Sequence, residues 1–238
     1  SGIFVLHFTN GSGMENATDA IHIARRNVIS QLFNDLSNFI NTPLKNAGNT
    51  QRVNIWIRDI NGISSSLIGA ASSFNVLPIT PTATTVTGGI TDNEVWKTIH
   101  TGVDSYTGVI SPLTVSSSAT TTSGLFYHGF VAFNFADPLI NWNLDTSINC
   151  PANLSDLYSV ALHEITHALG FASLIGANGN SRINNGNYYS RYDTFLRTTT
   201  NQLLISNNGC NTLYNNSFIA NQSQLNPGCT LFGPQLDN

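Results

Sequence analysis

The feature that most constrains this chain is a pair of histidines four residues apart in an apolar segment, SVALHEITHALGFAS, residues 159–173. Ser155 or Asp156 precedes the segment as a helix cap, and Gly170 follows it as a residue suited to end a helix with a positive φ. The sequence therefore predicts a helix from about Leu157 to Leu169. Its apolar flanks predict burial, and a buried helix does not normally carry His, Glu and His without partners.

His163, Glu164 and His167 form the pattern H-E-x-x-H. The spacing puts both imidazoles on one face of the helix, one turn apart, where their nitrogens can occupy adjacent corners of a tetrahedral zinc site. Glu164 lies on the same turn and can reach a zinc-bound water without being a ligand, so it suits the role of general base and then general acid. The alternative is a core helix whose polar side chains are satisfied by other partners.

The segment resembles the active-site helix of zincin metallopeptidases in its HExxHxxGF form. The resemblance is close over residues 157–173, and the order of the expected elements extends it more loosely over residues 1–173. It implies that His163 and His167 bind zinc and that Glu164 is the catalytic base. The chain departs from the metzincin branch, because Ser173 stands where that branch has a third histidine. The only methionine is Met14, so the methionine turn of that branch is missing too.

Short apolar runs and one periodic stretch predict the remaining elements. We expect strands at residues 2–8, 53–60 and 124–135, a long helix from Thr18 to Ile40, and loops over residues 61–88. A short helix around residues 92–100 is expected to start at a capping box formed by Thr91 and Glu94. The first strand, helix and strand are the elements of a βαβ unit.

The resemblance implies an α/β (α+β) fold, a zincin-like catalytic domain with two lobes. A twisted mixed sheet would be backed by the long helix and the active-site helix, and an edge strand at residues 124–135 would hold an extended substrate. We expect one domain over residues 1–238, with an N-terminal lobe at 1–170 and a loop-rich C-terminal lobe at 171–238. If the third zinc ligand lies beyond Asn238, this C-terminal lobe is incomplete.

The third zinc ligand is sought first among the residues after His167, which include no histidine or glutamate. Their only carboxylates are Asp193, beside an apolar patch in YYSRYDTFL, and Asp237, the penultimate residue. Asp193 is therefore the predicted ligand, as in the aspartate-ligand branch of the zincins. Three alternatives stay open: Asp193 is solvated or paired with a nearby arginine; the ligand lies beyond Asn238; or the ligand is one of the upstream histidines His7, His22, His100 and His128.

Two further residues are candidates for contacts with the substrate. His128 lies in the expected edge strand, beside the supposed substrate. Tyr192 is next to Asp193 and could donate a hydrogen bond to the oxyanion of the reaction. Surface aromatic packing is the alternative for Tyr192.

The composition limits the partners. Only 9% of the residues are charged, the net charge is −4 and no basic run occurs, which argues against nucleic acid. No apolar stretch approaches the length of a membrane span, so we expect none. Low charge with many Asn, Ser, Thr and Gly residues favours a secreted, extracellular protein, which we expect to be a monomer. A disulfide between Cys210 and Cys229 is favoured, which leaves Cys150 either free or with a partner outside this chain.

These observations predict a secreted zinc metalloendopeptidase with one Zn²⁺ per chain and a protein or peptide as substrate. Asp- and Asn-rich loops could in addition hold a structural Ca²⁺. The alternative from a different class is a catalytically inactive zincin-fold module for binding or adhesion. A hydrolase of some other amide also fits, because the motif specifies attack on a carbonyl and not the substrate that carries it.

Overall fold

The computed structural model describes residues 2–40, 52–60, 67–74, 88–91, 93–102, 127–176, 182, 187–198, 200–208 and 211–214. The chain divides into two compact units. The first unit comprises Ser1–Phe74 and Glu94–Leu169, and the second comprises Asn75–Asn93 and Gly170–Asn238. The H-E-x-x-H motif belongs to the first unit, whereas Asp193 belongs to the second.

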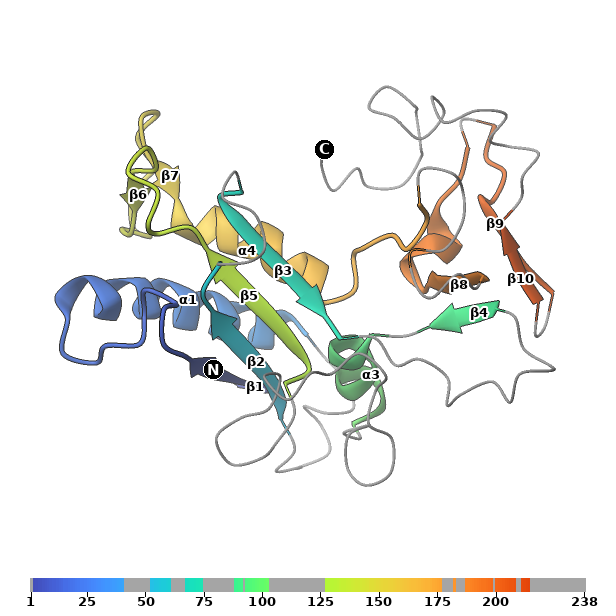
Figure 1. Ribbon diagram of the computed structural model, residues 1–238, viewed down its shortest axis with the longest axis horizontal. Helices are drawn as coiled ribbons and strands as arrows, with labels where there is room; N and C mark the ends of the chain where they lie inside the picture. The colour runs from blue at the N-terminus through green and yellow to red at the C-terminus, as the bar shows by residue number, and fades with distance from the viewer. Residues whose placement is uncertain are drawn as a thin grey trace. The chain divides into compact units, whose positions relative to one another are not determined.

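A four-stranded mixed sheet forms the centre of the first unit (Figure 1). Its strands, in spatial order, are β1 (Phe4–Phe8), β2 (Val53–Arg58), β5 (Gly129–Phe133) and β3 (Gly69–Ser73). β1, β2 and β5 run parallel, and β3 runs antiparallel to β5. The prediction of an α/β fold with a mixed sheet is confirmed.

Helix α1 (Ala20–Phe39) connects β1 to β2 and completes the predicted βαβ unit. The side chain of Asp19 caps the helix, because it accepts hydrogen bonds from the backbone N–H groups of Ile21 and His22. The helix buries one apolar face in the core, formed by Val28, Ile29, Leu32 and Phe33. Full burial of one such side chain contributes about 1.5–3 kcal/mol, so this face fixes the helix against the sheet.

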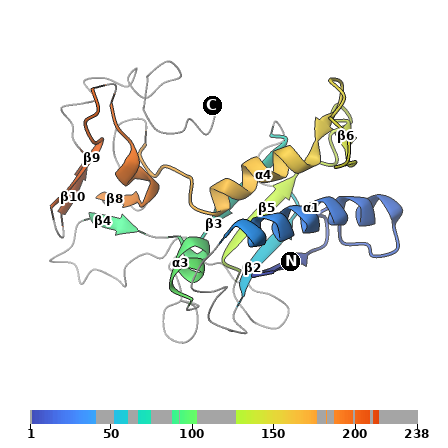
Figure 2. The ribbon, with the colours of Figure 1, turned by 180° about the vertical axis from the view of Figure 1, so that it is seen from behind.

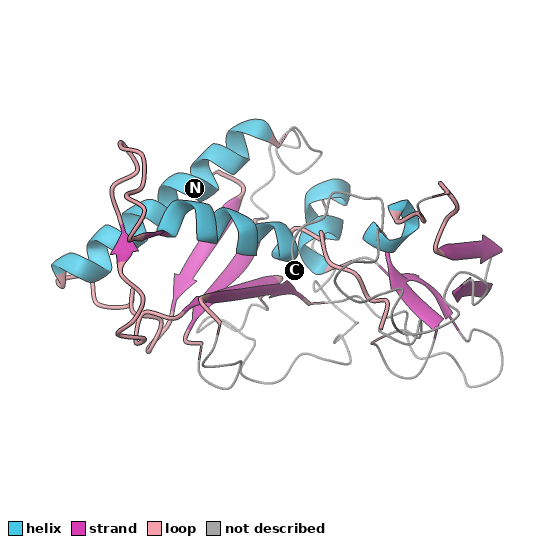
Figure 3. Cartoon of the chain, turned by 90° about the horizontal axis from the view of Figure 1, so that it is seen from above, coloured by secondary structure: helices cyan, strands magenta, loops and turns pink. Residues whose placement is uncertain are grey.

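Helix α4 (Leu157–Ala168) carries the motif and begins at Asp156, whose carboxylate accepts a hydrogen bond from the Ser159 N–H. The helix and its cap agree with the prediction. Residues spaced three or four apart are buried along one face, namely Leu157, Ala161, Ile165 and Ala168. α4 packs against α1, β3 and β5, and the two helices cover one face of the sheet (Figures 2 and 3).

The edge of the sheet differs from the prediction. The expected edge strand at residues 124–135 corresponds to β5, which lies between β2 and β3 and is therefore an interior strand. The edge strand beside β5 is β3, in a segment expected to form loops, and β1 is the opposite edge. β3 reads GAASS, with neither β-branched nor large apolar residues, so its strand conformation comes from pairing with β5 and not from local propensity.

The start of helix α3 (Glu94–Thr101) also differs from the prediction. The helix begins only at Glu94, whereas the expected capping residue Thr91 is the last residue of strand β4 (Gly88–Thr91). Instead, the Glu94 N–H donates to the Phe74 carbonyl at 2.7 Å and the Val95 N–H donates to Ser73 Oγ at 3.1 Å. The end of β3 thus supplies the cap, which a search for a local capping box cannot find.

The second unit is built from short pairs of strands. β4 pairs in parallel with β8 (Asn187–Ser190), and β9 (Ile205–Asn208) pairs antiparallel with β10 (Asn211–Tyr214). A single-turn 3-10 helix, η2 (Tyr192–Phe195), follows β8. The apolar centre of this unit consists of Ile175, Tyr189, Leu196, Leu204 and Ile205.

The loop before α4 contains Cys150 and lies between two short strands, β6 (Trp142–Asn143) and β7 (Ser155–Asp156). Cys150 is not disulfide-bonded. Cys210 and Cys229 lie outside the described residues, so their disulfide stays a prediction. In the part of the chain that is described, no helix is long and apolar enough to cross a membrane.

Candidate metal centre

The rings of His163 and His167 lie next to each other on one side of α4, in an edge-to-face arrangement. Their Nε2 atoms are 3.3 Å apart, their ring centroids are 4.9 Å apart and the ring planes are perpendicular. Both side chains are half-buried, and the opposite face of the helix is in the core. The i, i+4 spacing places the two nitrogens on the same side of α4. The buried apolar face fixes the orientation of the helix, so both nitrogens lie next to the same site.

The separation of the two nitrogens fits a shared metal ion. Zinc binds imidazole nitrogen at about 2.0–2.1 Å with a tetrahedral arrangement, which requires adjacent nitrogens to lie about 3.3–3.4 Å apart. The observed Nε2–Nε2 distance of 3.3 Å meets this requirement. A direct hydrogen bond between the rings has a similar length, so the distance fits the ion without identifying it. Among the described residues of the first unit, no third His, Cys, Asp or Glu joins the pair.

Glu164 is the most buried member of the motif, with 7% of its surface exposed. Its side chain lies against the edge strand β3, beside Gly69. Burial raises the pKa of Glu164, and the neighbouring histidines and the backbone N–H of Ala71 oppose that shift. A carboxylate with a raised pKa is a better proton acceptor at neutral pH, as general base catalysis requires.

Gly69 lies beside the same side chain. A Cβ atom at this position would lie 3.0 Å from Cγ and 3.2 Å from Oε1 of Glu164. The absence of a side chain at Gly69 therefore leaves the space in which the Glu164 carboxylate reaches the edge strand. No sequence signal pointed to Gly69 or Ala71, because their role depends on β3 lying along α4.

Asp193 is fully buried within the second unit, where it organises the turn between β8 and η2. Its Oδ2 accepts hydrogen bonds from the Ser190 N–H at 2.7 Å, the Ser190 hydroxyl at 2.9 Å and the Leu174 N–H at 3.0 Å. Its Oδ1 is buried and has no well-formed hydrogen bond to any described residue, although the Ser173 hydroxyl lies close to the carboxylate. Burial raises the pKa of Asp193, and these hydrogen bonds act against the shift.

The arrangement around Asp193 suits either of two roles. Its Oδ2 fastens the local backbone, which is a structural task, while Oδ1 retains the capacity to bind a cation. The Arg197 guanidinium donates to the Asn201 carbonyl at 3.1 Å. The metal-ligand role of Asp193 stays a prediction.

His128 and Tyr192 were expected near the substrate. His128 is fully buried in the first unit, and its Nδ1 accepts a hydrogen bond from the Asn54 N–H at 2.9 Å, so it is part of the core and not of an edge. Tyr192 is half-buried in the second unit, with its ring 6.2 Å from that of Phe171. Burial, and then the charge of Asp193, raises the pKa of Tyr192, which keeps the hydroxyl protonated as a hydrogen-bond donor.

The other upstream histidines have different partners. His7 Nε2 lies 2.9 Å from Asn54 Oδ1, His22 Nδ1 accepts a hydrogen bond from the Asn16 N–H, and the His100 ring stacks on Trp96. They belong to the same unit as the motif, and none of them lies with the motif pair in a metal-binding group. An upstream histidine as the third ligand is therefore not supported.

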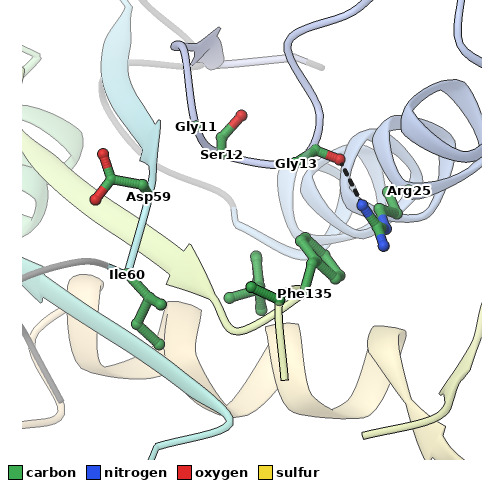
Figure 4. Close-up of a pocket in the computed structure, with 9 residues that line it drawn as sticks. Gly11, Ser12, Gly13, Arg25, Asp59, Ile60 and Phe135 are labelled. Atoms are coloured by element: carbon green, nitrogen blue, oxygen red, sulfur yellow. Dashed lines mark hydrogen bonds between the residues drawn. The ribbon is translucent and has the colours of Figure 1, made fainter. Parts of the chain in front are cut away.

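A pocket of about 200 Å³ lies elsewhere in the first unit (Figure 4). Arg25 and Phe135 line it, and the Arg25 guanidinium carbon is 3.9 Å from the centroid of the Phe135 ring. Arg25 Nη1 also donates to the Gly13 carbonyl at 2.9 Å, as the dashed line shows. These contacts fasten the loop after β1 to α1, so we assign Arg25 a structural role.

Comparisons of the chain with protein-family models, with curated proteins and with solved structures returned no match. The functional argument therefore depends on the chemistry and geometry of this chain's own residues.

Proposed function

We propose that this chain is a secreted, zinc-dependent metalloendopeptidase that hydrolyses peptide bonds in proteins. The observation that carries the proposal is the 3.3 Å separation of His163 Nε2 and His167 Nε2, with the buried Glu164 carboxylate on the intervening turn of α4. This combination matches the donor chemistry and the spacing that a zinc ion requires.

Each residue of the motif has a distinct task in this proposal. His163 and His167 hold the ion, and zinc bound there would polarise the substrate carbonyl and lower the pKa of a water molecule. Glu164 accepts the proton of the attacking water and later passes it to the leaving amine. The raised pKa of Glu164 suits both halves of this transfer.

Asp193 is the proposed third ligand, in a His-His-Asp site with one Zn²⁺ per chain. Its support is the buried Oδ1, which has no well-formed hydrogen bond to the described residues, while Oδ2 is held by three donors. A ligand carboxylate is commonly hydrogen-bonded in this way through its second oxygen. Tyr192 is the proposed hydrogen-bond donor to the developing oxyanion.

The edge strand β3 supports an extended polypeptide as the substrate. An unpaired strand edge offers backbone donors and acceptors to another chain, and such pairing needs no particular side chains. β3 lies along α4, the helix that carries the motif, and its residues Gly69–Ser73 are all small. A substrate strand added to β3 would bring its backbone close to Glu164.

A replacement of Glu164 by Gln tests the mechanism. We expect the variant to keep one zinc per chain and to lose about 10²–10⁴-fold in kcat/KM on a casein substrate, because the general base is removed. Glu15→Gln, the same change outside α4, is the matched control and should cleave at the parent rate. Parent-like cleavage by Glu164→Gln would refute the assigned mechanism.

The second candidate function is a catalytically inactive zincin-fold module that binds a protein or glycan partner. The observation that favours it is that no third ligand joins His163 and His167 among the described residues of the first unit. Metal analysis of the purified chain separates the two functions. Stoichiometric zinc, with cleavage lost to a chelator and restored by zinc, supports the enzyme, whereas a chain without stoichiometric metal supports the module.

A further inference from the structure

The pocket of about 200 Å³ in the first unit lies at the carboxyl ends of the parallel strands β1, β2 and β5 (Figure 4). The loop Gly11–Gly13 follows β1, Asp59 and Ile60 follow β2, and Phe133 and Phe135 mark the end of β5. Open α/β sheets bind their ligands outside the carboxyl ends of the strands. The volume is below the roughly 300–1,000 Å³ of sites for drug-sized ligands, so it suits a smaller molecule.

Two opposite charges border this pocket without pairing with each other. The Asp59 carboxylate forms no hydrogen bond or ion pair with any described residue. Arg25 donates through Nη1 to the Gly13 carbonyl, whereas its Nε is buried and has no partner in the part of the chain that the structure describes. A buried donor without a partner is costly, so an acceptor that reached this edge of the guanidinium would be stabilising.

The glycines of the loop bring it close to both charged side chains. The φ angles of Gly11 and Gly13 are positive, 83° and 73°. A Cβ atom at Gly11 would lie 3.5 Å from Asp59 Oδ2, and a Cβ atom at Gly13 would lie 3.1 Å from Arg25 Nη1. Two residues of chain span at most about 7 Å, so one short molecule can reach both charges. Figure 4 shows the carboxylate and the guanidinium apart, with the loop beside both.

We propose that this pocket binds a small zwitterion with an apolar body, namely an α-amino acid or a dipeptide with apolar side chains. Asp59 accepts hydrogen bonds from the ammonium group of the ligand, and the Nε edge of the Arg25 guanidinium donates to its carboxylate. Ile60 and Phe133 contact the apolar side chain. Arg25 thus has this role in addition to its structural one.

The proposed ligand site is separate from the zinc motif. The described residues that line the pocket come from neither α4 nor β3. The inference therefore does not depend on the proposed peptidase activity, and its test needs no catalysis.

An NMR titration of the ¹⁵N-labelled full chain with L-leucine and with L-leucyl-L-leucine tests the proposal. At least one of them should shift the amide signals of Gly11 and Gly13 and leave that of Gly170, at the end of α4, in place. N-acetylleucine lacks the ammonium group and leucinamide lacks the carboxylate. Each should bind more than about tenfold more weakly than L-leucine, because one charge-assisted hydrogen bond is lost.

Asp59→Asn is the decisive variant, because it keeps the shape of a side chain that has no partner among the described residues. It should bind L-leucine more than about tenfold more weakly than the parent, and its preference for L-leucine over N-acetylleucine should disappear. Asp137→Asn is the matched control. It makes the same change outside the pocket, where Asp137 Oδ1 accepts from the Leu139 N–H, and should bind like the parent. Arg25 is a poorer choice for substitution, since it also fastens the loop.

Three results would overturn the proposal. The first is that neither compound shifts the Gly11 and Gly13 signals at concentrations up to ~10 mM. The second is equal affinity for L-leucine and N-acetylleucine in the parent, which leaves Asp59 no ammonium group to recognise. The third is parent-like binding by Asp59→Asn, because the ligand then lies at another site.

Discussion

The contact between Tyr158 and Asp35 holds the motif helix α4 to α1, and its removal gives a quantitative test of the fold. The Tyr158 hydroxyl donates to Asp35 Oδ2 at 2.7 Å. Burial, followed by this hydrogen bond and the charge of Asp35, raises the pKa of Tyr158 to about 12. A tyrosine in the unfolded chain titrates near pH 10, so folding favours the protonated hydroxyl.

The size of the effect follows from the shift in the pKa. A difference of about two units corresponds to at most roughly 2.7 kcal/mol. Tyr158 is only partly buried, and solvent screening reduces this to about 1 kcal/mol, the usual net value of a hydrogen bond. Tyr158→Phe should therefore lower the free energy of unfolding by about 1 kcal/mol. The loss should be complete below pH 10 and should shrink between pH 10 and 12, because the hydroxyl of the unfolded parent then deprotonates while that of the folded parent stays protonated.

Urea unfolding followed by circular dichroism at pH 8, 10 and 11.5 measures this difference between the parent and Tyr158→Phe. Asp35→Asn is the control, since it keeps an acceptor but removes the charge, and it should lose less at pH 8 than Tyr158→Phe. A loss that is the same at pH 8 and pH 11.5, or a loss below about 0.3 kcal/mol at pH 8, would refute the assigned contact.

Two other substitutions test the fold and the site. Ser73→Ala should lower the free energy of unfolding by about 1–2 kcal/mol, because the buried Val95 N–H loses its acceptor at the start of α3. Thermal unfolding measures this loss, and Ser72→Ala, at an exposed neighbour, should stay within about 0.5 kcal/mol of the parent. Asp193→Asn should weaken zinc binding more than about tenfold in competition with a chelator, because the ligand charge is lost. Unchanged zinc affinity in that variant would remove Asp193 from the proposed site.

The sequence alone determines the elements that depend on residues close together in the chain. The motif helix follows from apolar residues three and four apart, the cap at Asp156 and the positive φ of 111° at Gly170. The unit of β1, α1 and β2 follows in the same way from periodicity and short apolar runs. The His163 and His167 nitrogens converge because helix geometry fixes side chains four residues apart on one face.

Only the tertiary structure decides which strand forms the edge of the sheet and what it does there. The segment GAASS has no alternation of apolar and polar residues and little β propensity. It becomes strand β3 because it forms a ladder of hydrogen bonds with β5. That pairing moves the strand of His128 into the interior and brings Gly69 and Ala71 to Glu164. Helix periodicity and caps are written within a few neighbouring residues, whereas strand order depends on contacts between segments far apart in the chain.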